Sequence, residues 1–217
     1  MTDEQGPPGG RPWRGQWPEQ RREARRRRLL DAALELFGTV GYAGTPLTAV
    51  CAQANVSPRH FYELYPGREQ LMADLYDEVV GELIRLVRAA QEAAPLAVEA
   101  RIRAGLRAAV LHETADPRRA RVLSLEAVGV SPWMEEHRRA VVTMFAEATE
   151  EQYRRLVEAG QLVDRPFRHV STALIGAFDE LLVDWLLSEP QPPASELVPV
   201  VEEVVLAVFR GRTVGAP

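Results

Sequence analysis

Apolar residues recur at helical spacing through most of the chain, and no stretch shows the alternation of a half-buried strand. The first stripe follows an arginine-rich run over residues 21–28 and consists of Leu30, Ala33, Leu34, Phe37 and Val40. A second stripe predicts a helix over residues 68–93, about 39 Å long at 1.5 Å per residue. Its apolar positions are Leu71, Leu75, Val79, Leu83, Leu86 and Val87. This helix is long enough to link two halves of the protein.

Helical spacing continues beyond Pro95, where start and stop residues divide the chain into five further helices. Asp116, Ser131 and Ser195 are expected as N-caps, and Gly160 is expected to end a helix. The helices are predicted over residues 98–113, 117–128, 133–159, 166–187 and 195–211. The sequence therefore predicts an all-α protein.

Two short helices joined by a tight turn are predicted between the arginine-rich helix and the long one. Thr45-Pro46 and Ser57-Pro58 each combine an N-cap residue with proline at the first helical position. Asn55 lies at the turn, and after Gly it is the residue that best tolerates the left-handed conformation. This layout is a helix-turn-helix, and its polar second helix is better explained as a DNA-reading surface than as core.

The same stretch carries a family signature without a gap. Its members are Gly41-Tyr42, Thr45, Val50, Ala54, Val56-Ser57, Phe61-Tyr62, Tyr65-Pro66 and Arg68-Glu69-Gln70-Leu71. Together they resemble the DNA-binding signature of the TetR family of transcriptional regulators, over about residues 25–72. Pro46 departs from that signature where a second Thr or Ser is common, Asn55 replaces the usual Gly, and Leu64 stands where an aromatic residue or His is frequent.

The resemblance assigns roles to residues of the helix-turn-helix. Ser57, Pro58, Arg59 and His60 would begin the recognition helix, and Arg59 is the best base reader because its guanidinium fork suits guanine. Thr45, Tyr62, Tyr65 and Arg68 would contact phosphates and set the register on double-stranded DNA.

Charge is divided unevenly along the chain. The net charge of −5 alone argues against a nucleic-acid-binding protein. Residues 1–71, however, hold 10 Arg and 8 acidic residues, whereas residues 72–217 hold 16 Arg and 23 acidic residues. The positive excess lies at the end with the helix-turn-helix, as expected if only that end meets phosphates. Residues 1–20 are predicted to be a disordered arm, or one that contacts DNA through Arg11 and Arg14.

Other classes of protein find little support in the sequence. No apolar run approaches the roughly 20 residues of a membrane span, and no export signal is present, so a cytoplasmic protein without membrane contact is expected. Nucleophile-elbow, dinucleotide, P-loop and zinc-protease motifs are absent, and no two of the four histidines are four residues apart. We expect no catalytic site, metal or cofactor. The alternative is a helical small-molecule-binding protein or enzyme that has inherited a helix-turn-helix.

A methionine- and aromatic-rich stripe in the 133–159 helix is either plain core or one wall of an effector cavity. In TetR-like proteins such a cavity lies in the C-terminal domain, bounded partly by helices equivalent to 98–113 and 131–159. The candidate effector-binding residues are Leu106, Val110, Trp133, Met134, His137, Val141, Met144 and Phe145.

The last two helices carry more apolar surface than a monomer needs, which favours a subunit interface. In the TetR family these helices form a four-helix bundle with a second subunit, so an isologous homodimer is expected. The candidate interface residues are Leu174, Phe178, Leu181, Leu182, Trp185, Val201, Val204, Val205 and Val208.

These observations predict a division into an arm over residues 1–20, a DNA-binding domain over 21–71 and an effector-binding and dimerisation domain over 72–217. The resemblance implies a homodimeric transcriptional regulator, most simply a repressor that a small apolar or amphipathic effector releases from a palindromic operator.

Overall fold

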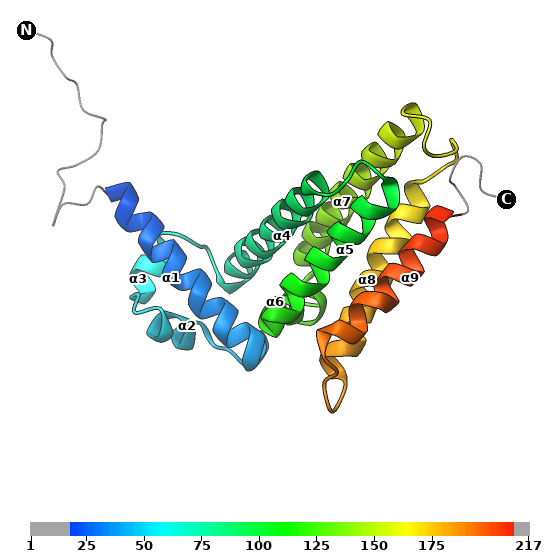
Figure 1. The fold of residues 1–217 in the computed structure, drawn as a ribbon. Helices are drawn as coiled ribbons and strands as arrows, with labels where there is room; N and C mark the ends of the chain where they lie inside the picture. The colour runs from blue at the N-terminus through cyan, green and yellow to red at the C-terminus, as the bar shows by residue number, and fades with distance from the viewer. Residues whose placement is uncertain (1–17, 211–217) are drawn as a thin grey trace, which may run out of the picture.

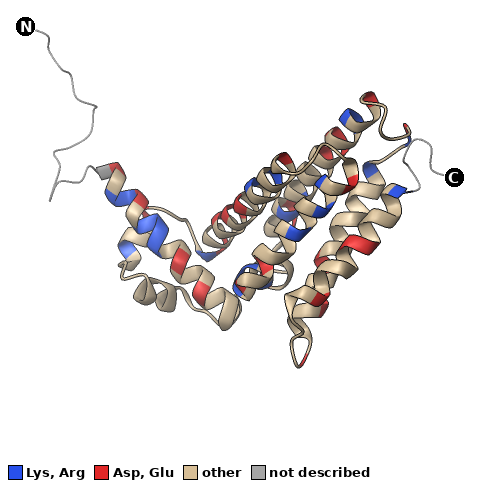
Figure 2. Cartoon of the chain, viewed as in Figure 1, with Lys and Arg blue, Asp and Glu red and all other residues tan. Residues whose placement is uncertain are grey.

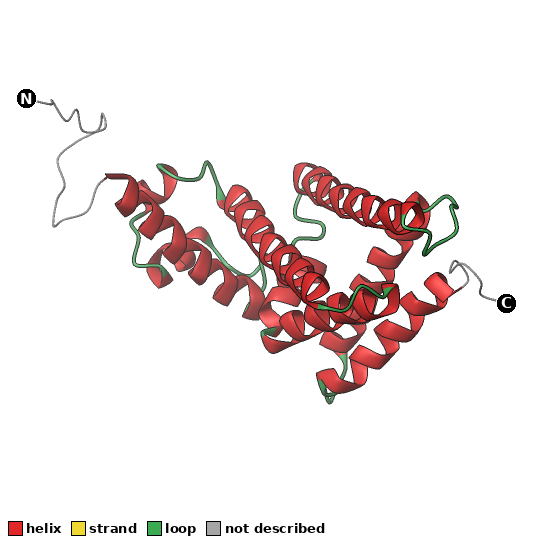
Figure 3. Cartoon of the chain, turned by 45° about the horizontal axis from the view of Figure 1, so that its top comes forward, coloured by secondary structure: helices red, strands yellow, loops and turns green. Residues whose placement is uncertain are grey.

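The computed structural model describes residues 18–210, and within them every regular element is a helix (Figures 1 and 3). In chain order they are α1 (Pro18–Thr39), α2 (Leu47–Gln53), α3 (Pro58–Tyr62), α4 (Arg68–Ala93), α5 (Val98–Ala115), α6 (Pro117–Arg121), a π-helical turn η1 (Val122–Glu126), α7 (Pro132–Glu158), α8 (Arg168–Leu187) and α9 (Ala194–Arg210). The all-α prediction is confirmed. The predicted arm lies almost wholly outside the described residues.

Helix termini follow the local sequence signals at three of the predicted caps. The side chains of Ser57, Asp116 and Ser131 each accept a hydrogen bond from a backbone N–H in the first turn of α3, α6 and α7. The prediction of Thr45 as an N-cap was wrong. The hydroxyl of Thr45 donates instead to the carbonyl of Gly41 at 2.7 Å, and α2 begins at Leu47 without a side-chain cap.

Two hydrophobic cores hold the helices together. The first joins α1, α2, α3 and α4, and it continues beyond residue 71 through Val122, Ala127 and Met134. The second joins α5, α7, α8 and α9 around residues such as Val110 and Val201. Since the first core crosses the predicted boundary at residue 71, packing itself does not separate the DNA-binding end from the rest.

The helices are arranged with α1–α3 at one end and α8–α9 at the other, and α4–α7 lie between them (Figure 1). Helix α4 packs along α5 and also contacts α1, as its length predicts. Two further elements link the halves, because α6 and η1 also contact α1. None of the helices in the described part of the chain has the length and apolar character needed to cross a membrane.

Candidate DNA-binding surface and effector cavity

The turn between α2 and α3 has the conformation that its sequence predicts. Asn55 has a φ of +50°, the left-handed region that Asn tolerates better than most residues. The following Val56 N–H donates to the carbonyl of Cys51 at 3.0 Å, which closes the end of α2. Phe61 is fully buried and packs against Tyr65, so it anchors the short α3 to the first core.

The first turn of α3 presents its side chains outward. Ser57, Pro58, Arg59 and His60 are all exposed, and the Arg59 side chain is 90% exposed. Arg59 lies 3.8 Å from Glu63, while the Nδ1 atom of His60 lies 3.0 Å from the Ser57 hydroxyl. Tyr62 is 60% exposed on the same helix. These side chains can reach a ligand outside the protein without any rearrangement of the core.

Two residues expected to contact phosphates through their side chains do not face outward. Thr45 and Tyr65 are buried, and the Tyr65 hydroxyl donates to Asp74 of α4. Their hydroxyls are used to hold the domain together, which corrects the prediction for both. Arg68 is half-buried, donates to the carbonyls of Tyr42 and Thr45, and lies 4.2 Å from the centre of the Tyr42 ring. Its phosphate contact remains a prediction.

The arginine-rich run divides between internal ion pairs and exposed positions. Arg26 donates to both carboxylate oxygens of Asp74 at 2.8 and 2.6 Å, and Arg27 pairs with Glu78 at 2.5 Å. These contacts fix α1 to α4. Arg22 and Arg28 are exposed. Figure 2 shows basic residues on α1 and α3 and acidic residues along α4, with acidic residues also on α1.

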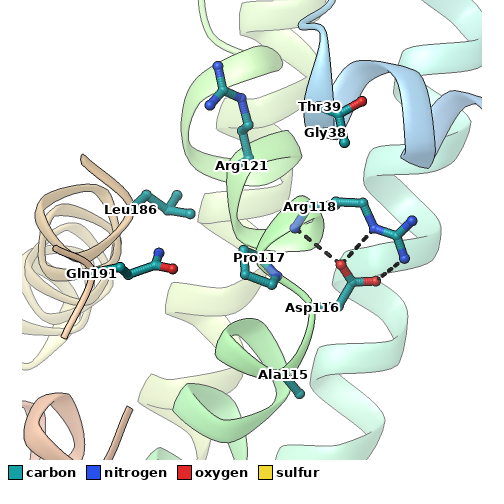
Figure 4. Close-up of a pocket in the computed structure, with 9 residues that line it drawn as sticks. All are labelled: Gly38, Thr39, Ala115, Asp116, Pro117, Arg118, Arg121, Leu186 and Gln191. Atoms are coloured by element: carbon teal, nitrogen blue, oxygen red, sulfur yellow. Dashed lines mark hydrogen bonds and ion pairs between the residues drawn. The ribbon is translucent and has the colours of Figure 1, made fainter. Parts of the chain in front are cut away.

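A junction between α1 and α6 joins the DNA-binding end to the helical body. Arg118 of α6 donates to Asp116 (Figure 4), and its guanidinium lowers the pKa of Asp116. Arg118 also donates to Glu35 of α1. The helices meet at Gly38, where a Cβ atom would lie 2.4 Å from the Cβ of Arg118. Next to this contact an open recess of about 570 Å³ extends toward Leu186 and Gln191 (Figure 4).

A second link to the DNA-binding end runs through η1. The carboxylate of Glu126 accepts the backbone N–H of Tyr42 at 2.8 Å and pairs with Arg121 at 3.0 Å. Tyr42 in turn packs on Phe37 and lies beneath Arg68. The loop that precedes the helix-turn-helix is therefore hydrogen-bonded directly to η1.

The helical body contains a largely apolar cavity of about 440 Å³ between α4, α5, η1, α7, α8 and α9. Its lining includes Tyr76, Val80, Leu83, Val87, Ile102, Leu106, Ala109, Leu123, Val141, Val142, Phe145, Leu174, Ile175, Phe178, Leu182, Val205 and Phe209. The polar members of the lining include Glu113, Ser124, Arg138 and Asp179. A mostly apolar cavity with few polar groups is typical of a small-molecule site.

The sequence located this cavity only in part. Leu106, Val141 and Phe145 line it as predicted. The other five candidates do not line it, which corrects their assignment. Val110 and Met134 are buried in the two cores, Trp133 and Met144 are 45% and 47% exposed, and the ring of His137 lies against Trp133 and bonds to Asp77 at 2.7 Å.

The residues of α7 that were assigned to the cavity in error lie on a different side of that helix from the residues that line it. At about 100° per residue, Trp133, His137 and Met144 cover one side of the helix, and Arg138, Val141 and Phe145 lie about 100° further round. The aromatic and methionine side chains suggested a ligand site on the side of α7 that does not face the cavity.

Glu113 is the lining residue whose absence from the sequence-based candidates matters most. It is 0% exposed, and neither carboxylate oxygen has a hydrogen-bond partner among the described residues. Burial raises its pKa from 4.5 to about 7. A signal was present in the sequence, since Glu113 lies three and seven residues after Val110 and Leu106, on the apolar face of α5.

The predicted interface residues divide into an inward and an outward set. Leu182, Trp185, Val201 and Val205 are buried within the single chain, and Leu174, Phe178, Leu182 and Val205 line the cavity, so the place of these residues in a subunit interface stays a prediction. Leu181 and Val208 are half-buried. Val204 is 41% exposed, and Val200 and Leu187 also present apolar surface on α8 and α9.

No group of three or more potential metal ligands occurs within residues 18–210. Cys51 is buried on the apolar face of α2, and burial raises the pKa of its thiol.

Comparison with known proteins places this geometry in context. Residues 29–75 match the family model described as bacterial regulatory proteins, tetR family. No curated protein sequence matches the chain.

Solved structures share the fold over most of both chains. The fatty acid degradation regulator FadR from Bacillus halodurans is 19% identical, with a TM-score of 0.77 over 86% of this chain and 96% of its own. FadR from Bacillus subtilis, solved with stearoyl-CoA, is 16% identical, with a TM-score of 0.75 over 83% and 97%. A TetR-family regulator from Pectobacterium atrosepticum is 19% identical, with a TM-score of 0.69 over 91% and 98%.

Proposed function

We propose that the chain, whose residues 29–75 match the tetR family model, is a homodimeric repressor released from a palindromic operator by a small apolar or amphipathic effector. The observation that carries this proposal is the apolar cavity, because its walls belong to α4 and η1, which also contact α1. One rigid set of helices therefore meets both the effector and the DNA-binding end. The stearoyl-CoA complex of Bacillus subtilis FadR supports an amphipathic effector, as a property of that neighbour.

Operator recognition is assigned to the exposed first turn of α3. In a dimer, two such helices would enter successive major grooves about 34–36 Å apart. Arg59 is the base reader of this proposal, because its side chain is almost fully exposed and Glu63 holds it only at 3.8 Å. Ser57, His60 and Tyr62 would complete the contacts.

The DNA-binding part is tested by fluorescence anisotropy with DNA from upstream of the protein's own operon. Arg59→Ala is expected to weaken specific binding by about 1–3 kcal/mol and to relax preference at one operator position. Arg155→Ala, an exposed arginine in the second half of α7, is the matched control and should leave affinity unchanged. Unchanged sequence preference in the Arg59 variant would refute its assignment.

Dimerisation is assigned to the outward faces of α8 and α9, where Val200, Val204 and Leu187 are exposed. Adjacent valines provide a matched pair of variants. Val204→Glu places a charge on the outer face, so it should give a folded monomer by light scattering. Val205→Glu buries a charge in the second core and should unfold the chain. A Val204→Glu protein that stays dimeric and binds operator would place the interface elsewhere.

Release from DNA is assigned to a change in how α4, α6 and η1 meet α1. An effector alters DNA affinity only by its differential affinity for the DNA-competent and incompetent states. The contacts that can differ are Arg118 with Glu35 and Glu126 with the Tyr42 N–H, because each joins the body to the DNA-binding end. A coupling of about 1–3 kcal/mol is expected.

A further inference from the structure

Glu113 is a buried carboxyl group for which the described part of the chain supplies no hydrogen-bond partner. Both its oxygens are buried and lack a hydrogen bond among the described residues, and the side chain borders the cavity. The ring of His112 is 3.9 Å away, too far for a hydrogen bond. Most buried polar groups in folded proteins are hydrogen-bonded, so an exception that borders a cavity points to a partner that enters it.

Charges around Glu113 are mainly negative. Burial is the main cause of the raised pKa of Glu113; among the charges, Arg119 lowers this pKa, and Glu82, Asp116 and Asp179 raise it. Asp179 also lines the cavity, where it accepts a hydrogen bond from Ser124 at 2.5 Å. An excess of acidic groups beside an apolar cavity favours a cationic ligand group over an anionic one.

Arg138 is the competing polar group of the cavity, since its Nε is also buried without a hydrogen bond. Its guanidinium, however, already pairs with Glu135 at 3.4 Å. Neither oxygen of Glu113 accepts a hydrogen bond from residues 18–210, so the larger unmet demand is for hydrogen-bond donors. An anion held by Arg138 is the opposite outcome, and the test below includes it.

We propose that the cavity binds amphipathic amines, with an apolar body packed among Leu83, Leu106 and Phe145 and a protonated amine donating N–H hydrogen bonds to Glu113. This rests on the proposed function, because it takes the cavity as the effector site. A cavity of about 440 Å³ falls within the range that holds small organic ligands. Ionised Glu113 and an ammonium group would satisfy each other in a setting where either one alone is costly.

The test compares three probes of equal chain length, decylamine, decanol and decanoate, by calorimetry with the full-length protein at pH 8 and without DNA. Decylamine is expected to bind at least tenfold more tightly than the other two, with one molecule per chain. Glu113→Gln, which keeps the shape of the side chain, should weaken decylamine at least tenfold and change decanol less than threefold. Glu147→Gln, an exposed glutamate of α7, is the matched control and should change neither.

The other possible results of this binding experiment each contradict the proposal that the cavity binds amines. Tighter binding of decanoate than of decylamine would assign the polar end to Arg138 and overturn the proposal. Equal affinity for decylamine and decanol, or unchanged decylamine affinity in Glu113→Gln, would also overturn it while leaving the cavity as an effector site. If none of the three probes binds, the effector site of the proposed function fails as well, whereas operator binding by the same protein is measured separately.

Discussion

Asp74 and Glu113 are two acidic residues inside the same chain with opposite surroundings. Asp74 of α4 accepts hydrogen bonds from Arg26 Nε and Nη2 and from the Tyr65 hydroxyl. Glu113 of α5 is more deeply buried and accepts none among the described residues. The first carboxylate closes a network between α1, α4 and the end of the helix-turn-helix. The carboxylate of Glu113 instead borders the apolar cavity.

The contrast indicates different tasks for the two regions. A DNA-reading surface must be held in a fixed geometry, and charge-assisted hydrogen bonds across α1 and α4 do this. A ligand site instead leaves polar groups to be satisfied by the ligand, at some loss of stability in its absence. The protein therefore combines a fully hydrogen-bonded polar network at the DNA-binding end with a carboxylate in the helical body, Glu113, that accepts no hydrogen bond among the described residues.

The largest expected effect concerns Glu113→Gln. Because the pKa of Glu113 is about 7 in the folded chain against 4.5 as the ordinary value, the folded state binds the proton more tightly. Stability is therefore lost as pH rises from about 4.5 to about 7. Near pH 4.5 the free energy of unfolding of the variant should equal that of the wild type. At pH 8 it should be higher by about 3 kcal/mol.

Urea denaturation between pH 5 and 8 measures this difference. The pKa of the neighbouring His112 is lowered by burial and by Arg119, so His112 favours stability as pH rises and opposes Glu113 below about pH 6.5. Comparing variant with wild type at each pH removes that contribution. A constant difference across the range would mean that Glu113 has a partner in solution.

Asp74→Asn should lower the free energy of unfolding, whereas Glu113→Gln should raise it. The variant removes the charge that accepts both Arg26 hydrogen bonds and the Tyr65 hydroxyl, at a site that is about one-quarter exposed. A loss of about 1–2 kcal/mol is expected, reduced from a fully buried pair by solvent screening. Asp31→Asn removes an exposed i, i+4 pair with Arg27 and should cost less than about 0.5 kcal/mol. If Asp74→Asn and Asp31→Asn cost the same free energy of unfolding, the Asp74 network would contribute no more than an exposed ion pair.

The smallest expected effect concerns Gly38, where the two regions touch. A Cβ at this position would lie 2.4 Å from the Arg118 Cβ, so Gly38→Ala must separate α1 from α6. The overpacking cost of about 1–3 kcal/mol is partly offset by about 1 kcal/mol of helix propensity. A net loss of about 1 kcal/mol in thermal unfolding is expected, with a change in operator affinity. Unchanged operator affinity would show that the α1–α6 contact does not set the position of the DNA-binding end.

The DNA-binding end could be predicted from sequence because its signals are local. Ser57 caps the helix that follows it, Asn55 takes the left-handed turn, and Phe61 anchors α3. Each depends on neighbours within a few residues, which the sequence displays directly. Tyr65 was misassigned because its partner, Asp74, lies on another helix.

The cavity could be predicted only in part because it depends on which side of each helix faces which neighbour. Trp133 and Met144 have the chemistry of a ligand site, but they lie on an exposed side of α7. Val205 and Leu182 suggested a subunit interface, yet both are buried in the second core of a single chain. Periodicity shows that a helix has an apolar side, and tertiary packing decides what covers it.

The central claim is that occupancy of the cavity and binding of operator DNA are coupled. Its most direct test is operator affinity, measured by fluorescence anisotropy with the full-length protein at increasing concentrations of whichever ten-carbon probe binds the cavity. The account predicts that saturating probe weakens operator binding by about 5- to 150-fold, and that operator DNA weakens probe binding by the same factor. Probe bound at one molecule per chain with no change in operator affinity would contradict the account.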